Sequence, residues 1–365
     1  MQNNKPNVLL VESGGHYKVL PHLYLMLSKV FDVEVLLPKS GISKVSFIPE
    51  CKLVSCLSMY FIFLSALFRG RQYDYLYIAT APQYGRSGID FYYVLSFLIL
   101  VFFYGDKVIV HIRDNNKFFS SGSVYQNLLG YLRRKSVLDA RLICFESKTL
   151  LSNFKDMASC DDSKLFVAYV YYSDFNFVDY VAFPYDSRSS IKIGLTGSID
   201  SFRRDYDTLI HALGLLKPEV VNRISFAVLG ECSGQAMHVI NQIEKYCPVQ
   251  YAPGYISDDD FLDIGSSCDF LLSPLKSELG YGLNKGTGAF GDAIFLKKNL
   301  LLPSFADPYV EYSAFSSYYE EGDSDSLAKS IDLFVNSPSS LILDDGCFDS
   351  FSSISVSNEL AHKLS

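Results

Sequence analysis

The chain has 365 residues, of which 49% are hydrophobic and 20% charged, and its formal net charge is −8. This length predicts two domains, and the apolar content excludes an intrinsically disordered chain. The negative charge argues against a nucleic-acid-binding protein, because such proteins usually present a basic face. The eight cysteines form no Cys-x-x-Cys pair and several lie in apolar runs, which predicts buried thiols in a reducing cytoplasm.

Short apolar strands alternate with helical segments through the first half of the chain. The predicted strands are 7–12, 33–37, 75–80, 107–111, 141–145 and 165–170, and a helix is predicted over 19–30. Continuous apolar strands separated by helices are typical of a parallel sheet that is covered on both faces.

Two segments of this half are the most apolar, Met59–Phe68 and Phe91–Tyr104. Both are shorter than the ~20 residues that a membrane-spanning helix needs, so both are predicted to be mainly buried helices. Arg69 and Arg71 follow the first, which leaves an alternative: an apolar face with basic flanks that rests on a membrane, extended by Arg133–Lys135. The N-terminal sequence lacks the basic start and long apolar run of a signal peptide, which predicts a cytoplasmic protein.

Polar and turn residues interrupt the pattern near 183–190, and the pattern then restarts. Strands are predicted at 191–195, 224–229, 249–252, 270–273 and 300–302, and helices at 205–216, 236–246 and 258–266. The predicted fold class is therefore α/β, with two tandem Rossmann-like domains that face each other across a cleft. We expect the domains to span 1–186 and 187–345, and the tail 346–365 to form a helix that packs back on the first domain.

The segment Glu278–Pro303 (ELGYGLNKGTGAFGDAIFLKKNLLLP) combines a glycine-rich loop, a helix and a buried strand. Backbone N–H groups at a helix N-terminus bind anions, a lysine adds positive charge, and an acid accepts hydrogen bonds from hydroxyl groups. The segment therefore predicts a site for a phosphorylated, hydroxyl-rich ligand, with a plain surface loop as the alternative. Its candidate residues are Lys285, Gly286, Thr287, Gly288 and Asp292.

Polar residues also follow the predicted strands of the first half, where ligands of open α/β sheets bind. The first strand leads into Gly14, Gly15 and His16. His111, Arg113 and Asp114 lie at the end of the strand KVIVH, and such a cluster suits the orientation of hydroxyls or the acceptance of a proton. The alternative for His111 is a structural histidine capped by Asp114. Glu146, after RLICF, is a further candidate whose alternative is a helix-capping acid.

Two segments of the second half add basic and glycine-containing turns. In Gly194–Leu213 (GLTGSIDSFRRDYDTLIHAL), a strand ends near glycine, and Arg203 and Arg204 precede a helix. Ala227–Gly230 (AVLG) and Tyr251–Ile256 (YAPGYI) are strand–turn pieces. Guanidinium groups match the geometry of phosphate oxygens, so the arginine pair is a candidate phosphate site, with an exposed helix start as the alternative.

Together with the glycine-rich loop, these segments resemble the GT-B glycosyltransferases. The closest likeness is to the large retaining group that includes bacterial mannosyl- and glucosyltransferases of cell-surface polysaccharides. The resemblance is best over Ile191–Pro303 and mainly architectural before it. One departure is Ser198, which stands where many members have a first arginine.

The resemblance implies a role for each matching residue. The family usually shows two glutamates, the first near the donor sugar and the second on the nucleotide ribose. Glu278 matches the first, whereas position 286 is glycine and Asp292 stands for the second acid in a longer loop. The implied catalytic residues are His111, Asp114 and Glu278. The implied donor-binding residues are Gly14, Gly15, His16, Arg203, Arg204, Gly230, Lys285, Gly286, Thr287, Gly288 and Asp292.

The resemblance also implies the activity and the partners. The expected enzyme moves a sugar from a nucleotide-sugar donor to a glycan or lipid-linked glycan acceptor in cell-surface polysaccharide synthesis, with retention and without metal or organic cofactor. It would act in the cytoplasm at the inner face of the membrane. A sugar-nucleotide 2-epimerase of the same fold and an inactive sugar-nucleotide-binding partner subunit are the alternatives. A dinucleotide oxidoreductase is disfavoured, because no Gly-x-Gly-x-x-Gly follows a strand.

Overall fold

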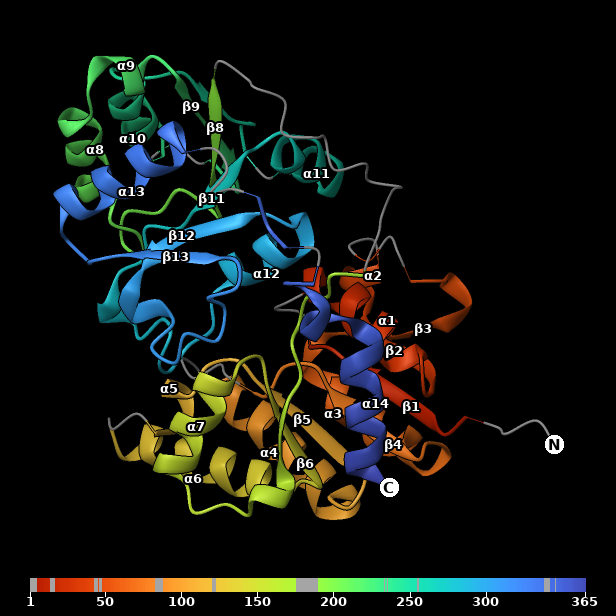
Figure 1. The fold of residues 1–365 in the computed structure, drawn as a ribbon. Helices are drawn as coiled ribbons and strands as arrows, with labels where there is room; N and C mark the ends of the chain where they lie inside the picture. Colours follow the sequence, from red (N-terminus) through yellow and green to blue (C-terminus); the bar gives the residue numbers. More distant parts are fainter. Residues whose placement is uncertain are drawn as a thin grey trace. The chain divides into compact units, whose positions relative to one another are not determined.

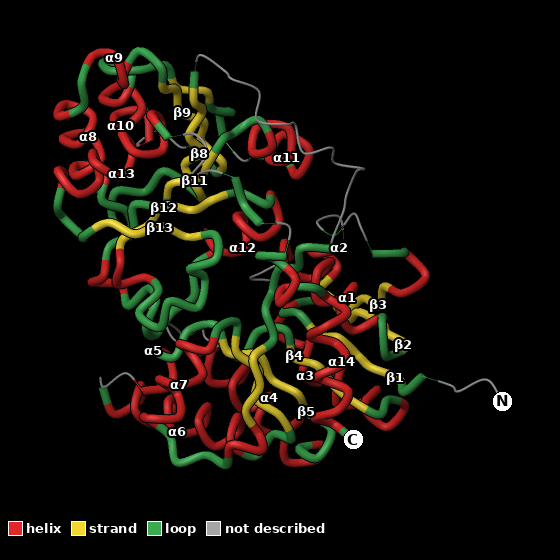
Figure 2. Tube along the Cα trace, viewed as in Figure 1, coloured by secondary structure: helices red, strands yellow, loops and turns green. Residues whose placement is uncertain are grey.

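The computed structural model describes residues 5–13, 17–42, 45, 48–82, 88–119, 123–174, 190–232, 234, 236–254, 256–337, 342–344 and 346–365. The chain divides into two units, which are drawn in Figures 1 and 2. The first comprises Met1–Phe175, Asn284–Gly286 and Phe351–Ser365, and the second comprises Asn176–Leu283 and Thr287–Ser350. The predicted boundary at 186 lies outside the described residues.

The first unit is built on a seven-stranded sheet in the order β3-β2-β1-β4-β5-β6-β7. Each neighbouring pair of strands is parallel, as the apolar runs predict. The strands are β1 (Asn7–Val11), β2 (Asp32–Pro38), β3 (Leu53–Cys56), β4 (Tyr75–Ile78), β5 (Val108–Ile112), β6 (Leu142–Phe145) and β7 (Leu165–Val167).

Helices cover both faces of this sheet, because successive side chains of a buried strand point to opposite sides. In β1, Leu9 and Val11 enter the core on one face, and Val8 and Leu10 enter the core on the other. The first face is covered by α3 (Ile62–Arg69), α4 (Gly88–Tyr104), α6 (Val124–Leu138) and α7 (Lys148–Met157). The second is covered by α1 (Leu20–Ser28) and α14 (Ser353–Leu364), and the short helices are α2 (Lys39–Ile42) and α5 (Asn116–Phe119).

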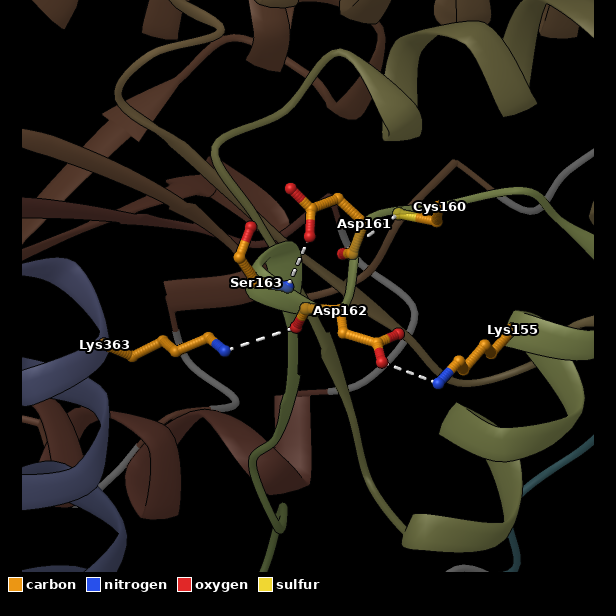
Figure 3. A network of polar contacts seen from close by, with 6 residues as sticks. All are labelled: Lys155, Cys160, Asp161, Asp162, Ser163 and Lys363. Atoms are coloured by element: carbon orange, nitrogen blue, oxygen red, sulfur yellow. Dashed lines mark hydrogen bonds and ion pairs between the residues drawn. The ribbon is translucent and has the colours of Figure 1, made fainter.

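The C-terminal helix α14 belongs to the first unit and is fixed by both apolar and polar contacts. Its residues Val356, Leu360 and Leu364 are buried in the core that α1 shares. At its start, the backbone N–H and hydroxyl of Ser353 donate to the Asp174 carboxylate at 2.8 and 2.6 Å. At its end, the Lys363 ammonium donates to the backbone carbonyl of Asp162 at 3.3 Å (Figure 3).

The polar network in Figure 3 continues from that carbonyl into the segment before β7. The Asp162 carboxylate pairs with Lys155 of α7 at 2.7 Å. The Asp161 carboxylate accepts the backbone N–H of Ser163 at 2.9 Å and thereby starts the 3-10 turn η5 (Asp162–Lys164). These contacts link α14, α7 and β7 at one corner of the first unit.

His22 of α1 is a buried base in the core on the α14 side of the sheet. Its ring lies 5.0 Å from the Tyr171 ring, and Nδ1 accepts the backbone N–H of Tyr172 at 3.4 Å. Burial lowers the pKa of His22 from 6.5 to about 3. Between these two values the unfolded chain binds the proton that the folded chain excludes, so stability falls as the pH drops below 6.5.

We expect the protonation of His22 in the unfolded chain to lower the free energy of unfolding by about 1.4 kcal/mol for each pH unit below the unfolded pKa. A His22→Gln variant is expected to unfold with a weaker pH dependence than the wild type in this window. Urea unfolding at a series of pH values measures it. The exposed His362 serves as a control through His362→Gln. An unchanged pH dependence in His22→Gln would show that His22 is not the responsible group.

The eight cysteines are free thiols, and most of them lie in the cores. Five are buried, Cys51 is exposed, and Cys160 and Cys347 are half-buried. Burial raises the pKa of Cys144 and of Cys268 to about 12, as expected for small apolar side chains that carry no reactive thiolate.

The second unit contains a six-stranded parallel sheet in the order β10-β9-β8-β11-β12-β13. Its strands are β8 (Ile191–Thr196), β9 (Ile224–Leu229), β10 (Val249–Gln250), β11 (Phe270–Leu272), β12 (Asn299–Pro303) and β13 (Ser316–Tyr319). Its helices are α8 (Tyr206–Leu215), α9 (Pro218–Val221), α10 (Ala236–Ile243), α11 (Asp258–Ser266), α12 (Gly288–Leu296) and α13 (Ser324–Asn336). α8, α10 and α13 pack together around one core, and α11 packs on α12. Both units therefore have the predicted α/β architecture.

Candidate functional site

The second sheet changes its direction of growth between β8 and β11. β9 and β10 are added on one side of β8, whereas β11, β12 and β13 follow on the other. The loops after β8 and β11 diverge at this switch point, which is where open α/β sheets bind their ligands. Gly197 and Ser198 follow β8, and Ser273 and Pro274 follow β11.

Arg204 joins these two loops. Its Nε donates to the Ser198 carbonyl and its Nη1 donates to the Ser273 hydroxyl, each at 3.2 Å. The backbone supports the same contact, because the Asp205 N–H donates to the Pro274 carbonyl at 2.7 Å. The half-buried guanidinium is thus held at the switch point, and a fixed planar fork of N–H donors suits phosphate oxygens.

Two glycines let the chain pass closely beside Arg204. Gly197 has a φ of +70°, and a Cβ there would lie 2.2 Å from Arg204 Nη2. A Cβ on Gly230, after β9, would lie 2.1 Å from the Gly197 carbonyl carbon. Gly230 therefore has a packing reason to be glycine, and its predicted contact with the donor stays a prediction.

The N-terminus of α12 lies at the same edge of the sheet, because this helix connects β11 to β12. Thr287 caps it, with its hydroxyl accepting the Ala289 N–H at 3.3 Å. Gly288 is exposed, and no described atom lies within 4 Å of the position that its Cβ would take. Asp292 is half-buried and lies one turn later on the same helical face. The positive end of the helix is thus open to an anion.

Arg203 and Glu278 have surroundings that differ from those of Arg204. Arg203 Nε pairs with Asp200 at 2.6 Å, and its side chain is 42% exposed. Glu278 is exposed in the 3-10 turn η6 (Ser277–Leu279), which ends at Gly280 with a φ of 72°. Their predicted roles beside the donor stay predictions.

The first sheet has its own switch point, between β1 and β4. Glu12 follows β1, and its carboxylate accepts the hydroxyl of Thr80, which lies just beyond β4, at 2.8 Å. Glu12 is fully buried and Thr80 is 5% exposed. The candidates Gly14, Gly15 and His16 come directly after Glu12 but lie outside the described residues.

Arg113 and Glu146 form a buried ion pair beyond the next two strands, β5 and β6. Arg113 Nε lies 3.0 Å from Glu146 Oε2, and the two side chains are 12% and 9% exposed. Burial lowers the pKa of Arg113, but the negative charges of Glu146 and, more weakly, of Glu12 raise it above its ordinary value. Arg113 Nη1 is buried without a hydrogen-bond partner among the described residues, so a ligand oxygen would satisfy it.

The segment Asn284–Gly286 pairs with the residues that follow β5. The Asn115 N–H donates to the Asn284 carbonyl at 2.6 Å, and the Gly286 N–H donates to the Arg113 carbonyl at 3.1 Å. Between these two bonds, Lys285 and Asp114 form an isolated antiparallel β-bridge. These three residues therefore belong to the first unit, although the predicted second domain includes them.

Glu146 explains the glycine at position 286. A Cβ there would lie 1.1 Å from Glu146 Oε1, so the carboxylate fills the space that a side chain would need. Counting along the sequence expects an acid at 286, and a side chain there would have to displace the Glu146 carboxylate, which pairs with Arg113.

His111 lies within β5 rather than beyond it, and it is fully buried. Its Nδ1 lies 3.0 Å from the hydroxyl of Tyr77 on β4, and the β6 residue beside it is Cys144. Asp114 is 8% exposed, and its Oδ1 accepts the Asn116 N–H at 3.0 Å. A catalytic role for His111 or Asp114 stays a prediction.

No sequence-family model matches the chain, and no curated protein matches it by sequence. Solved structures match nearly all of it. The UDP-GlcNAc 2-epimerase from Neisseria meningitidis, bound to UDP-GlcNAc, is 12% identical with a TM-score of 0.58, over 98% of this chain and 99% of that one. The α,α-trehalose 6-phosphate synthase from Burkholderia multivorans is 10% identical with a TM-score of 0.60, over 99% of this chain and 98% of that one.

A UDP-forming α,α-trehalose-phosphate synthase from Burkholderia vietnamiensis matches likewise, at 9% identity and a TM-score of 0.58, over 99% of this chain and 98% of that one. This protein has the GT-B fold. The resemblance that the sequence predicted is confirmed at the level of the fold, since identities this low carry the fold and no more.

In this GT-B protein, the sequence pattern missed two residues at the switch point of the first sheet. Glu12 and Thr80 each stand within two residues of a strand end. That position is the signal that would have found them, because the carboxyl ends of parallel strands share one edge of the sheet. Their partners were not predictable, because each contact joins segments that are far apart in the sequence.

Proposed function

We propose that this GT-B protein is a glycosyltransferase that uses a nucleotide-sugar donor. The acceptor in this proposal is a glycan or lipid-linked glycan of bacterial cell-surface polysaccharide synthesis, met at the inner face of the cytoplasmic membrane. The reaction proceeds with retention and needs no metal or organic cofactor. Sugar-nucleotide chemistry in the solved structures of similar fold supports the general class.

The observation that carries the proposal is the anchored Arg204 at the β8/β11 switch point, on the edge where α12 begins. Transfer from a nucleotide sugar releases a diphosphate, and fixed positive groups and backbone N–H dipoles stabilise the charge that develops on it. Arg204, Thr287 and Gly288 would hold the diphosphate in this proposal, with Asp292 on the ribose. Arg203, Gly230, Lys285 and Gly286 are assigned to the donor, and His111, Asp114 and Glu278 to catalysis.

The first test is a thermal-shift screen of nucleoside diphosphates and nucleotide sugars. A ligand that binds only the folded protein raises its unfolding temperature, and the size of the shift grows with ligand concentration. We expect one base to be preferred, because nucleotide sites discriminate bases by hydrogen bonding. A flat response to every diphosphate and nucleotide sugar would refute the proposal. The preferred donor is then incubated with glycan acceptors, and sugar transfer is measured by mass spectrometry.

A sugar-nucleotide 2-epimerase is the second candidate, favoured by the UDP-GlcNAc 2-epimerases among the structural matches. An epimerase changes its sugar nucleotide without an acceptor, so proton NMR of the protein with the donor alone separates the two activities. Appearance of the C2 epimer supports the second candidate, and an unchanged donor that is consumed on addition of acceptor supports the first. Binding without turnover in either assay supports an inactive partner subunit.

A further inference from the structure

Helix α4 is apolar around its circumference, although part of it faces solvent. Tyr93, Phe97 and Leu100 are buried against the sheet, whereas Phe102 and Phe103 are 82% and 62% exposed. A helix that is apolar on every side is normally enclosed by protein or in contact with lipid. Among the described residues, no helix is long and apolar enough to cross a bilayer.

The neighbours of α4 extend this apolar surface. α4 packs between α3 and α6. The ends of α3 and α4 meet, because a Cβ on Gly70 would lie 2.9 Å from the Tyr104 ring, and Phe68 beside that contact is 82% exposed. The end of α6 lies beside the end of α4, because a Cβ on Gly105 would lie 2.7 Å from the Asp139 carbonyl oxygen. The exposed apolar residues of α6, which are Val124, Leu128 and Tyr131, lie about two to four turns before that end.

Phe68, Phe102 and Phe103, at the ends of α3 and α4 and beside the end of α6, define what we call the α3–α4–α6 face. Isolated exposed apolar residues are common on soluble proteins, but three exposed aromatic rings at the adjoining ends of neighbouring helices mark an interaction surface. The aromatic content fits the boundary between lipid headgroups and acyl chains, where a ring can sit with a basic side chain beside it.

Basic residues lie beside the face, in a protein whose net charge is −8, and the exposed Asp106 follows α4. Arg69 and Arg71 are exposed where α3 ends, and Lys135 lies in the last turn of α6, with Asp139 as its partner at 3.4 Å. Arg133 is buried, and Arg134 donates to the Phe118 carbonyl at 3.0 Å. The basic extension that the sequence suggests is therefore reduced to Lys135, and the arginines beside Phe68 are the main cations.

We propose that the α3–α4–α6 face binds an anionic lipid bilayer, with its aromatic rings at the interface and Arg69 and Arg71 on the lipid phosphates. Basic residues beside an apolar surface match the negative charge of such a membrane. The inference rests on the proposed function for its biological sense, since a lipid-linked acceptor lies in the same bilayer. Vesicle binding needs neither donor nor acceptor, so its failure is distinguishable from a failure of the proposed activity.

The test is flotation of the full chain with vesicles of phosphatidylglycerol and phosphatidylcholine in equal parts, and with vesicles of phosphatidylcholine alone. The wild type is expected to float with the anionic vesicles and to remain largely unbound with the neutral ones. Phe102→Ser/Phe103→Ser and Arg69→Gln/Arg71→Gln are each expected to reduce binding to the level of neutral vesicles. Their matched controls lie in the second unit: Phe202→Ser, whose ring is 75% exposed, and Lys217→Gln/Lys329→Gln.

Circular dichroism and the unfolding temperature check that each variant is folded, which is expected because the replaced side chains are exposed. No flotation of the wild type would overturn the proposal, as would equal binding to both vesicle types that the arginine variant leaves unchanged. Sedimentation provides a further readout. A wild-type dimer that Phe102→Ser/Phe103→Ser converts to a monomer, without vesicle binding, would assign the face to self-association instead.

Discussion

Arg113→Met is expected to lower the free energy of unfolding by about 3–5 kcal/mol, the usual effect of removing one partner from a buried ion pair. The change leaves the Glu146 carboxylate, whose side chain is 9% exposed, against Gly286 and without its cation. The buried Glu12 also loses the nearby positive charge. Urea unfolding followed by circular dichroism measures the loss from the midpoint and slope.

A double variant separates the charge effect from lost packing. Arg113→Met/Glu146→Gln removes both charges and is expected to recover a large part of the loss, because an uncompensated carboxylate no longer remains in the core. Lys155→Met is the surface control, since the Lys155–Asp162 pair is 49% and 66% exposed, and its midpoint is expected to stay near that of the wild type. A double variant that is no more stable than Arg113→Met would contradict the buried-charge explanation.

Arg204→Ala is expected to weaken binding of the preferred nucleoside diphosphate roughly 10- to 100-fold, since a hydrogen bond to a charged group contributes about 1.5–3 kcal/mol. Arg204 Nε and Nη1 already hold the loops after β8 and β11, so the guanidinium is fixed before a ligand arrives. Arg204→Lys keeps the charge but loses the planar fork, and its affinity is expected to fall between those of the wild type and the alanine variant. Isothermal titration calorimetry measures all three.

Two further variants make this test specific. Lys329→Ala removes an exposed cation on α13 and is expected to leave affinity unchanged. Lys285→Ala removes the lysine of the glycine-rich loop, which belongs to the first unit, and a loss of affinity in this variant supports the assignment of Lys285 to the donor. Unchanged affinity in both Arg204→Ala and Lys285→Ala would refute the proposal that these residues bind the diphosphate of the donor. Unfolding measured without ligand checks that the second unit of each Arg204 variant is still folded after the loop contacts of Arg204 are changed.

Most strands could be predicted because burial on both faces makes them continuous apolar runs. β1, β5 and β9 were predicted to within a residue at each end. β3 (Leu53–Cys56) and β13 (Ser316–Tyr319) were missed, and both are edge strands of mixed polarity that are half-exposed over most of their length. Half-burial removes the apolar run on which the prediction depends.

The start of a helix often depends on one side chain, and the start of α7 decides between the two interpretations of Glu146. Glu146 had a helix-capping acid as its alternative, but Ser147 caps α7 by accepting the Leu150 N–H at 3.2 Å. Glu146 is therefore left to pair with Arg113. A sequence shows both residues as plausible caps, and only the position of Arg113 distinguishes them.

The sequence by itself determined the two α/β units, the glycine-rich loop and the helix that follows it, because these depend on local apolar periodicity and local turn chemistry. Only the tertiary structure decided what that loop contacts. The Glu146 carboxylate occupies the space beside Gly286, and Arg204 is fixed at a switch point because its guanidinium donates to Ser198 and Ser273. Such contacts join residues that are distant along the chain, and their geometry is set by strand order rather than by any local pattern.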